Sequence, residues 1–173
     1  MADEAQWAGT DFQQPPRNDG GVALCGACAR TRTCRLGLTT ERLDDDGVAC
    51  FDIVCSAANE GGPNVAHGGW TAGVLDEVLG HVPLLHQQLT VTGTLEVRFV
   101  KPVPIERPLQ ARAWVDRVEG VKWFVSGELV LASSRALLAS ATGVWIARKR
   151  DDHFGSFEKW LAAQDSAEDV RES

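Results

Sequence analysis

Alternating and helical runs of apolar residues divide the middle of the chain into a regular series of elements. Two short runs on either side of "DDDG" (44–47), at 35–43 and 48–56, predict a β-hairpin. A loop rich in Gly, Pro and Asn follows at 57–64, and apolar residues at helical spacing then predict a helix over about 67–82. Period-two alternation predicts four more strands, over 90–103, 108–120, 122–133 and 136–149. A short closing helix is expected over 154–164.

The predicted central helix is apolar around most of its circumference, at Trp70, Val74, Leu75, Val78, Leu79 and Val82. A helix of this kind is normally buried. One buried helix wrapped by a six-stranded antiparallel sheet predicts an α+β fold of the hot-dog type. We expect this domain to span 23–150, after a flexible N-terminal arm over 1–22. A short C-terminal helix and an acidic tail are expected over 151–173.

Composition and charge narrow the classes of function. The 173 residues are 44% hydrophobic and 24% charged, which suits one globular domain. A net charge of -7 disfavours a nucleic-acid partner or an anionic membrane surface, because both attract basic proteins. The sequence contains no apolar run long enough to span a membrane. The N-terminus is acidic and polar, unlike a signal peptide, so a cytoplasmic location is expected.

The cysteine pattern favours free thiols. There are five cysteines, at positions 25, 28, 34, 50 and 55, and an odd number argues against a disulfide framework. The spacing of "CGAC" at 25–28 is that of a zinc-binding pair, and Cys34 would be a third ligand. A structural zinc site needs four ligands, however, and no second pair or nearby His is present. We therefore expect no metal and no cofactor.

One face of the predicted helix carries small residues and a single acid. Gly69, Ala72, Gly73, Asp76 and Gly80 recur at spacings of three and four. At the start of the helix, Gly68 and Gly69 place backbone N–H groups at the positive end of the helix dipole. Without Cβ atoms nearby, a ligand oxygen could reach these amides, as in a site that polarises a carbonyl group.

The helix geometry separates these two features. Gly68 and Asp76 are eight positions apart, which is about 12 Å along a helix axis. One helix therefore cannot bring both to the same carbonyl carbon. If they cooperate, the amide comes from one subunit and the carboxylate from another, as a two-fold dimer would allow.

Structural roles remain open for each of these residues. We favour His67 as a cap of the helix or a loop contact over a direct catalytic role. Gly68 and Gly69 could serve packing alone, and Asp76 could belong to a structural network. Glu77 is expected to face solvent or an interface, and no partner is evident for His81.

Three segments resemble a known family. "NVAHGGWTAGVLDEVLG" (64–80) resembles the signature of hot-dog acyl-CoA thioesterases, in the PaaI-like group of the 4-hydroxybenzoyl-CoA thioesterase superfamily. "LEVRFVKPVPIERPLQARAWV" (95–115) resembles the strand, Pro-containing turn and strand that follow it in that family. "CGACARTRTCRLGL" (25–38) resembles the Cys-bearing lead-in of some relatives. The likeness covers about 25–150.

The resemblance implies a role for each matching residue. The Gly68 amide would polarise the thioester carbonyl, and Asp76 would be the nucleophile or the general base that activates water. Thr92 falls where some relatives carry a hydroxyl that holds the attacking water. His67, Gly69 and Asn64 would lie against the substrate. The implied partner is acyl-CoA, bound by a homodimer or a dimer of dimers with the site at the subunit interface.

The chain departs from the family upstream of the helix. Relatives often carry Asn or Gln six residues before the His, and that position is Gly61 here. Asn59 and Asn64 are the nearest amides, and we favour Asn59 as the substitute. For the CoA phosphates, Arg98 and Lys101 near the Pro turn are candidates, as are the basic residues at 148–150.

Two other functions remain open. A hot-dog hydratase or dehydratase would need an Asp/His pair that the spacing of His67 and Asp76 does not match well. A non-catalytic acyl-CoA-binding protein would share the fold without the chemistry. The acyl group cannot be read from the sequence.

Overall fold

The computed structural model describes residues 13–169 and confirms the predicted order of strands and central helix. Its main elements are β1 (Leu38–Leu43), β2 (Ala49–Val54), α2 (Gly68–Leu85), β5 (Thr90–Phe99), β6 (Pro108–Glu119), β7 (Lys122–Leu131) and β8 (Leu137–Ala147). Each lies within about three residues of the predicted boundaries, apart from β5, which ends before the Pro-containing turn. That turn ends the strand because Pro cannot donate to a strand ladder.

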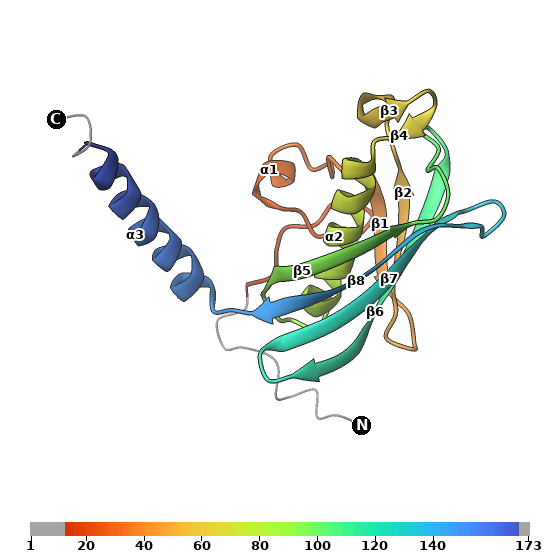
Figure 1. Ribbon diagram of the computed structural model, residues 1–173. Coiled ribbons are helices and arrows are strands. Elements are labelled where there is room, and N and C mark those ends of the chain that lie inside the picture. Colours follow the sequence, from red (N-terminus) through yellow and green to blue (C-terminus); the bar gives the residue numbers. More distant parts are fainter. Residues whose placement is uncertain (1–12, 170–173) are drawn as a thin grey trace.

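The six strands form one antiparallel sheet in the order β1-β2-β6-β7-β8-β5. α2 lies across one face of this sheet and packs against β2, β5, β6, β7 and β8 (Figure 1). A single long helix against a six-stranded antiparallel sheet is the predicted hot-dog arrangement. β1 and β5 are the two outermost strands, so each has one edge that no strand of the sheet covers.

The core lies between α2 and the sheet. The apolar residues predicted to bury the helix are all buried, with Val74, Leu75 and Val78 completely inaccessible. They meet sheet residues such as Phe51 and Trp145, which are also fully buried. The face with Ala72, Gly73, Asp76 and Gly80 is only half-buried. The helix therefore presents its small-residue stripe on the side that the sheet leaves open.

Several short elements complete the chain. They are α1 (Gly26–Ala29), a 3-10 helix at Ala57–Asn59, and a small two-stranded ribbon of β3 (Glu60–Gly62) and β4 (Val65–Ala66) just before α2. The C-terminal helix α3 (Arg150–Asp169) extends beyond the predicted 154–164 at both ends. α3 extends away from the sheet (Figure 1).

The segment from residue 13 to 24 differs from the flexible arm expected over 1–22. Asn18 accepts two backbone hydrogen bonds through its side chain, Val22 is completely buried, and the Glu41 N–H donates to the Gly20 carbonyl at 3.0 Å. This segment therefore runs along the outer edge of β1. Its Pro, Gly and Asn content suggested a loose arm, but these residues build turns here that pack. Residues 1–12 lie outside the described residues.

Candidate active site

His67 begins the central helix as its cap. Its backbone is extended, and its ring Nδ1 accepts a hydrogen bond from the Gly69 N–H at 2.9 Å. This contact satisfies one of the amides that every helix start leaves unpaired. The capping role favoured from the sequence is therefore confirmed, and the same bond fixes His67 Nδ1 as an acceptor.

The two glycines after His67 differ in what they offer a ligand. The Gly69 N–H is occupied by the His67 ring. Within residues 13–169, the Gly68 N–H has no hydrogen-bond partner. A side-chain carbon at Gly68 would have only the Phe99 ring nearby, at 3.7 Å. The amide that remains free for a ligand oxygen is therefore that of Gly68.

Asp76 is held by a hydroxyl from the neighbouring edge strand. Thr92 on β5 donates through Oγ1 to Asp76 Oδ1 at 2.8 Å. The strand pairing between β5 and β8 is irregular between Thr92 and Thr94. Such a bulge redirects side chains, and bulges are frequent beside active sites. The structure thus brings together two residues that the sequence separates by sixteen positions.

The loop before α2 explains the departure at Gly61. A Cβ at Gly61 would lie 2.8 Å from the His67 Cα, so no side chain fits between the two backbones. The favoured substitute, Asn59, lies beside His67 through its backbone, because its carbonyl accepts from the His67 N–H at 2.8 Å. Its side-chain amide instead donates to Ser56 at 3.3 Å. The structure therefore brings Asn59 to the helix start without aiming its side chain there.

The remaining predicted ligand residues lie on the surface. Asn64 is exposed, occupies the left-handed region at φ +60°, and its N–H donates to Glu60. Arg98 on β5 and Lys101 just after it are also exposed. Within residues 13–169, no hydrogen bond or ion pair joins these three residues to Asp76 or Gly68, so their roles remain predictions.

A buried network of charged side chains includes Glu77, the residue next to Asp76 on α2. His81 contacts Glu41 of β1 through Nδ1 at 3.0 Å and Glu77 through Nε2 at 3.2 Å. Glu41 is fully buried and also accepts from the Ala23 N–H at 2.9 Å and from Arg17 at 3.4 Å. Glu77 thus contacts His81 rather than only solvent, and His81 has two partners. Neither contact was evident from the sequence.

The network holds a proton on His81. Burial by itself lowers the pKa of His81, but hydrogen bonds and charge from Glu41 and Glu77 outweigh it and raise that pKa from 6.5 to about 9. Burial also acts to raise the pKa of Glu41, yet the hydrogen bond and charge of His81 prevail and lower it. His81 is therefore a buried cation between two carboxylates at neutral pH.

We expect the protein to lose stability as the pH rises from about 6.5 to 9. The folded state binds the His81 proton more tightly than the unfolded chain, so this contribution is complete below pH 6.5 and disappears as the pH passes 9. Its size is on the order of 3 kcal/mol. Urea unfolding at pH 6.5, 7.5 and 9 measures it, with His81→Gln as the comparison. Equal slopes with pH for both proteins would contradict this assignment.

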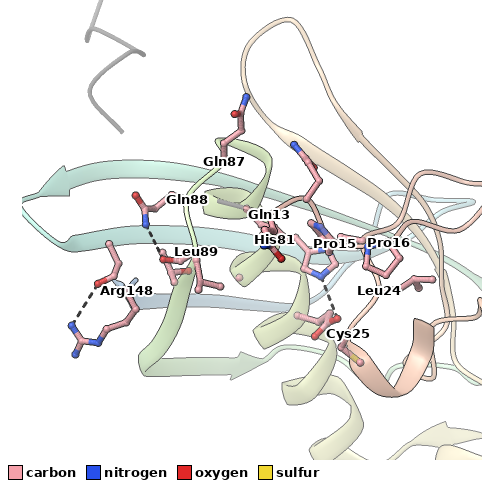
Figure 2. A pocket seen from close by; sticks show the side chains of 18 of the residues that line it. Gln13, Pro15, Pro16, Leu24, Cys25, His81, Gln87, Gln88, Leu89 and Arg148 are labelled. Atoms are coloured by element: carbon pink, nitrogen blue, oxygen red, sulfur yellow. Dashed lines mark hydrogen bonds and ion pairs between the residues drawn. The ribbon is translucent and has the colours of Figure 1, made fainter. Parts of the chain in front are cut away.

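A cavity of about 800 Å³ opens beside this network (Figure 2). Its walls come from residues 13–29, from the second half of α2, from the start of β5 and from the end of β8. Leu24, Leu84 and Leu89 supply apolar surface, while Arg148 supplies positive charge. Glu77 and His81 also line it, whereas Asp76 does not. The cavity therefore lies next to the Asp76 site on the helix but is separate from it.

No group of three or more His, Cys, Asp or Glu side chains within residues 13–169 is arranged to hold a metal ion. No helix in the described part of the chain is long and apolar enough to cross a membrane.

The fold and the site together define a hot-dog protein with an open helix start and a hydroxyl-bound carboxylate on the same helix. The sequence matches the family model of the thioesterase superfamily over residues 63–137, which includes α2, β5, β6 and β7. Over this region the chain is similar to the thioesterase superfamily.

Similar proteins agree with this match. Over 87 residues the chain is 30% identical to acyl-coenzyme A thioesterase THEM4 of Bos taurus, a match that covers 50% of this chain and 35% of that protein. The chain thus spans about a third of the length of that relative.

Two solved structures share the fold. A putative thioesterase of Ralstonia eutropha, a phenylacetic acid degradation-related protein, is 25% identical with a TM-score of 0.59, covering 72% and 92% of the two chains. The PaaI protein of E. coli is 21% identical with a TM-score of 0.60, covering 71% and 85%.

Proposed function

We propose that the protein is an acyl-CoA thioesterase, which hydrolyses the thioester to a free acid and CoA. The observation that carries this proposal is the Asp76 carboxylate, held through one oxygen by Thr92 on a half-buried helix face. Within residues 13–169 its other oxygen, Oδ2, has no protein partner. The match to the thioesterase superfamily model over residues 63–137 and the likeness to an acyl-coenzyme A thioesterase support the substrate class.

In the proposed mechanism Asp76 activates the attacking oxygen. As a general base, it accepts a proton from a water molecule that attacks the thioester carbonyl carbon. As a nucleophile, it would attack that carbon itself, and water would then release the acid. In either case Thr92 keeps the carboxylate in one orientation. The carbon–sulfur bond then breaks, and the CoA thiolate leaves and takes up a proton.

The Gly68 amide stabilises the negative oxygen that forms during this attack. Its N–H is free, it lies at the start of α2, and the missing Cβ leaves room for the carbonyl group. A preorganised donor of this kind is most effective where charge develops in the transition state. Gly68 and Asp76 are about 12 Å apart along the helix, so each site combines Gly68 of one subunit with Asp76 of another.

The outer edge of β5 is the surface that best suits the subunit contact. The edge of β1 is covered by the chain, since the Glu41 N–H donates to Gly20 and a side chain at Gly20 would clash with the Thr39 carbonyl. β5 is ten residues long, pairs only with β8, and exposes most of its side chains. An open strand edge readily pairs with another strand. This edge also carries Thr92, which contacts Asp76.

We expect a dimer, or a dimer of dimers, that forms through β5. Thr94→Lys places a charge in the middle of this exposed edge and should shift the protein toward monomer with loss of activity. The matched control is Thr39→Lys, on the edge of β1 that the chain covers. Light scattering and activity are measured on both. A wild-type monomer with full activity would refute the shared site.

Hydrolysis of a panel of acyl-CoA esters tests the proposed function. Release of CoA should be followed by chromatography rather than by a thiol reagent, because the exposed Cys25 would react as well. We expect hydrolysis of at least one ester and no hydration of an enoyl-CoA. Hydration without hydrolysis would indicate a hydratase, and binding without either would indicate a non-catalytic protein. The phosphate-binding roles of Arg98 and Lys101 and the cytoplasmic location stay predictions.

A further inference from the structure

Cys25 and Cys28 occupy the two ends of a single helical turn. Cys25 is the cap of α1, and the Ala29 N–H closes the turn on the Cys25 carbonyl at 2.9 Å. Positions three apart on a helix have Cα atoms about 5 Å apart. A disulfide bond joins residues whose Cα atoms are about 4.4–6.8 Å apart. The backbone therefore already holds the two cysteines at a separation that a disulfide can bridge.

The two thiols differ in their access to solvent. Cys25 is exposed and lines the 800 Å³ cavity (Figure 2). Cys28 is 4% exposed, lies in the hydrophobic core, and its sulfur accepts from the Arg35 N–H at 3.3 Å. A small molecule can thus reach Cys25 through the cavity, while the burial of Cys28 leaves little of it open to solvent.

The surroundings of the two sulfurs also favour different charge states. Hydrogen bonds from Cys28, chiefly from its backbone N–H, lower the pKa of Cys25 despite partial burial. Burial raises the pKa of Cys28, and the nearby Cys25 sulfur raises it further. The thiolate is the attacking form in thiol–disulfide exchange. Cys25 is therefore placed to react first, and Cys28 second.

We propose that Cys25 and Cys28 form a site of thiol–disulfide exchange with low-molecular-weight disulfides. The Cys25 thiolate attacks one sulfur of the small disulfide, which forms a mixed disulfide and releases one thiolate. Cys28 then loses its proton to solvent and attacks the Cys25 sulfur. This second step forms the Cys25–Cys28 disulfide and releases the second thiolate. The protein gives up two electrons and two protons, and the small disulfide becomes two thiols.

The second step becomes easier once the first has occurred. While Cys25 is a thiolate, its charge opposes ionisation of Cys28. In the mixed disulfide Cys25 carries no charge, so this opposition ends. Cys25, the exposed cysteine, thus forms the mixed disulfide, and Cys28, the buried cysteine, then displaces the small thiol from it.

Incubation of the full chain with glutathione disulfide tests the proposal. Free thiols are then blocked at low pH, and intact and peptide masses are measured. We expect the wild type to lose two hydrogen atoms and to carry one disulfide that maps to Cys25 and Cys28. Cys28→Ser should instead stop at the mixed disulfide, with one glutathione on Cys25. Cys25→Ser should react at least about ten-fold more slowly, because the buried Cys28 is then the remaining thiol of the pair. Cys50→Ser, a half-buried cysteine on β2, is the matched control and should behave like the wild type.

Three results would overturn the proposal. One is that the wild-type protein stays reduced under conditions in which glutathione disulfide fully oxidises free dithiothreitol. Another is a disulfide that maps to Cys28 and Cys34, which is also buried near it. The third is Cys25→Ser reacting at the wild-type rate. Because the wild-type peptide map alone decides the first two, the test does not depend on the folding of any variant.

Discussion

Replacing Asp76 by asparagine should lower the turnover of acyl-CoA by about 100-fold or more. The change keeps the shape of the side chain and its contact with Thr92, but removes the group that accepts a proton or attacks the carbonyl. Steady-state hydrolysis of the best ester in the panel measures the loss. Asp45→Asn removes the same charge from an exposed position in the turn between β1 and β2, and should leave turnover unchanged. Wild-type turnover in folded Asp76→Asn would make the carboxylate structural.

Gly68→Pro tests the other half of the same site. Gly68 is the first residue of the helix, where Pro fits without breaking it, and His67 already has the extended backbone that precedes Pro. The substitution removes the free N–H, so activity should fall by about 100-fold or more. Mixing Gly68→Pro with Asp76→Asn subunits should restore activity, because one site of the mixed dimer then holds both an intact amide and an intact carboxylate. No recovery in a confirmed mixed dimer would exclude a site shared between subunits.

Glu41→Gln should destabilise the fold by about 3–5 kcal/mol at pH 7. Glu41 is fully buried against His81, and the neutral amide would leave the charge of His81 with Glu77 as its remaining carboxylate. Urea unfolding at a fixed protein concentration measures the loss. Glu158→Gln, exposed on α3, is the matched control and should change stability by less than about 0.5 kcal/mol.

The pH dependence separates a charge effect from a packing effect in this experiment. Above pH 9 the proton leaves His81, so the charge that Glu41 balances is gone. The stability difference between the wild type and Glu41→Gln should therefore shrink as the pH rises. A difference that stays constant from pH 6.5 to 9 would assign the effect to packing alone.

The sheet and the central helix could be predicted because their apolar patterns are regular. β7 and the first half of β6 alternate between buried and less buried residues, with buried Leu109, Ala111 and Ala113 on one face of β6. The apolar residues of α2 are those that the sheet buries. The packed segment at 13–24 could not be predicted, because it is held by turns and by single hydrogen bonds rather than by a periodic apolar face.

The buried charge network could not be predicted from the sequence, because it depends on an irregularity in β1. Leu38 and Glu41 both face inward although they are three positions apart, which a regular strand does not allow. The pairing with β2 shifts between Leu38 and Thr40, and this shift turns Glu41 toward His81. The sequence alone gives no sign of the shift. Glu41 was therefore not identified as a buried residue from the sequence.

The residues of the candidate site could be proposed from the sequence, but only some of their contacts could. The small-residue stripe and the glycines at the helix start identified Asp76 and Gly68. Thr92 followed from the family resemblance, and the structure adds its hydrogen bond. The lack of room for a side chain at Gly61 results from the close approach of two backbones, which cannot be recognised from the sequence. The sequence also did not show which of the Gly68 and Gly69 amides is free to bind a ligand.

The strand order also bears on how the chain folds. β6, β7 and β8 follow one another through short connections, whereas β5 pairs with β8 across the two strands between them, as in Thr90 with Ala147. Closing a longer loop costs more chain entropy, so the three-strand meander should form before β5 joins it. β5, which carries Thr92, should then be among the last strands to join the sheet. Backbone amides in β5 should accordingly exchange with solvent faster than those in β7, and the hydroxyl that orients Asp76 becomes available only as folding finishes.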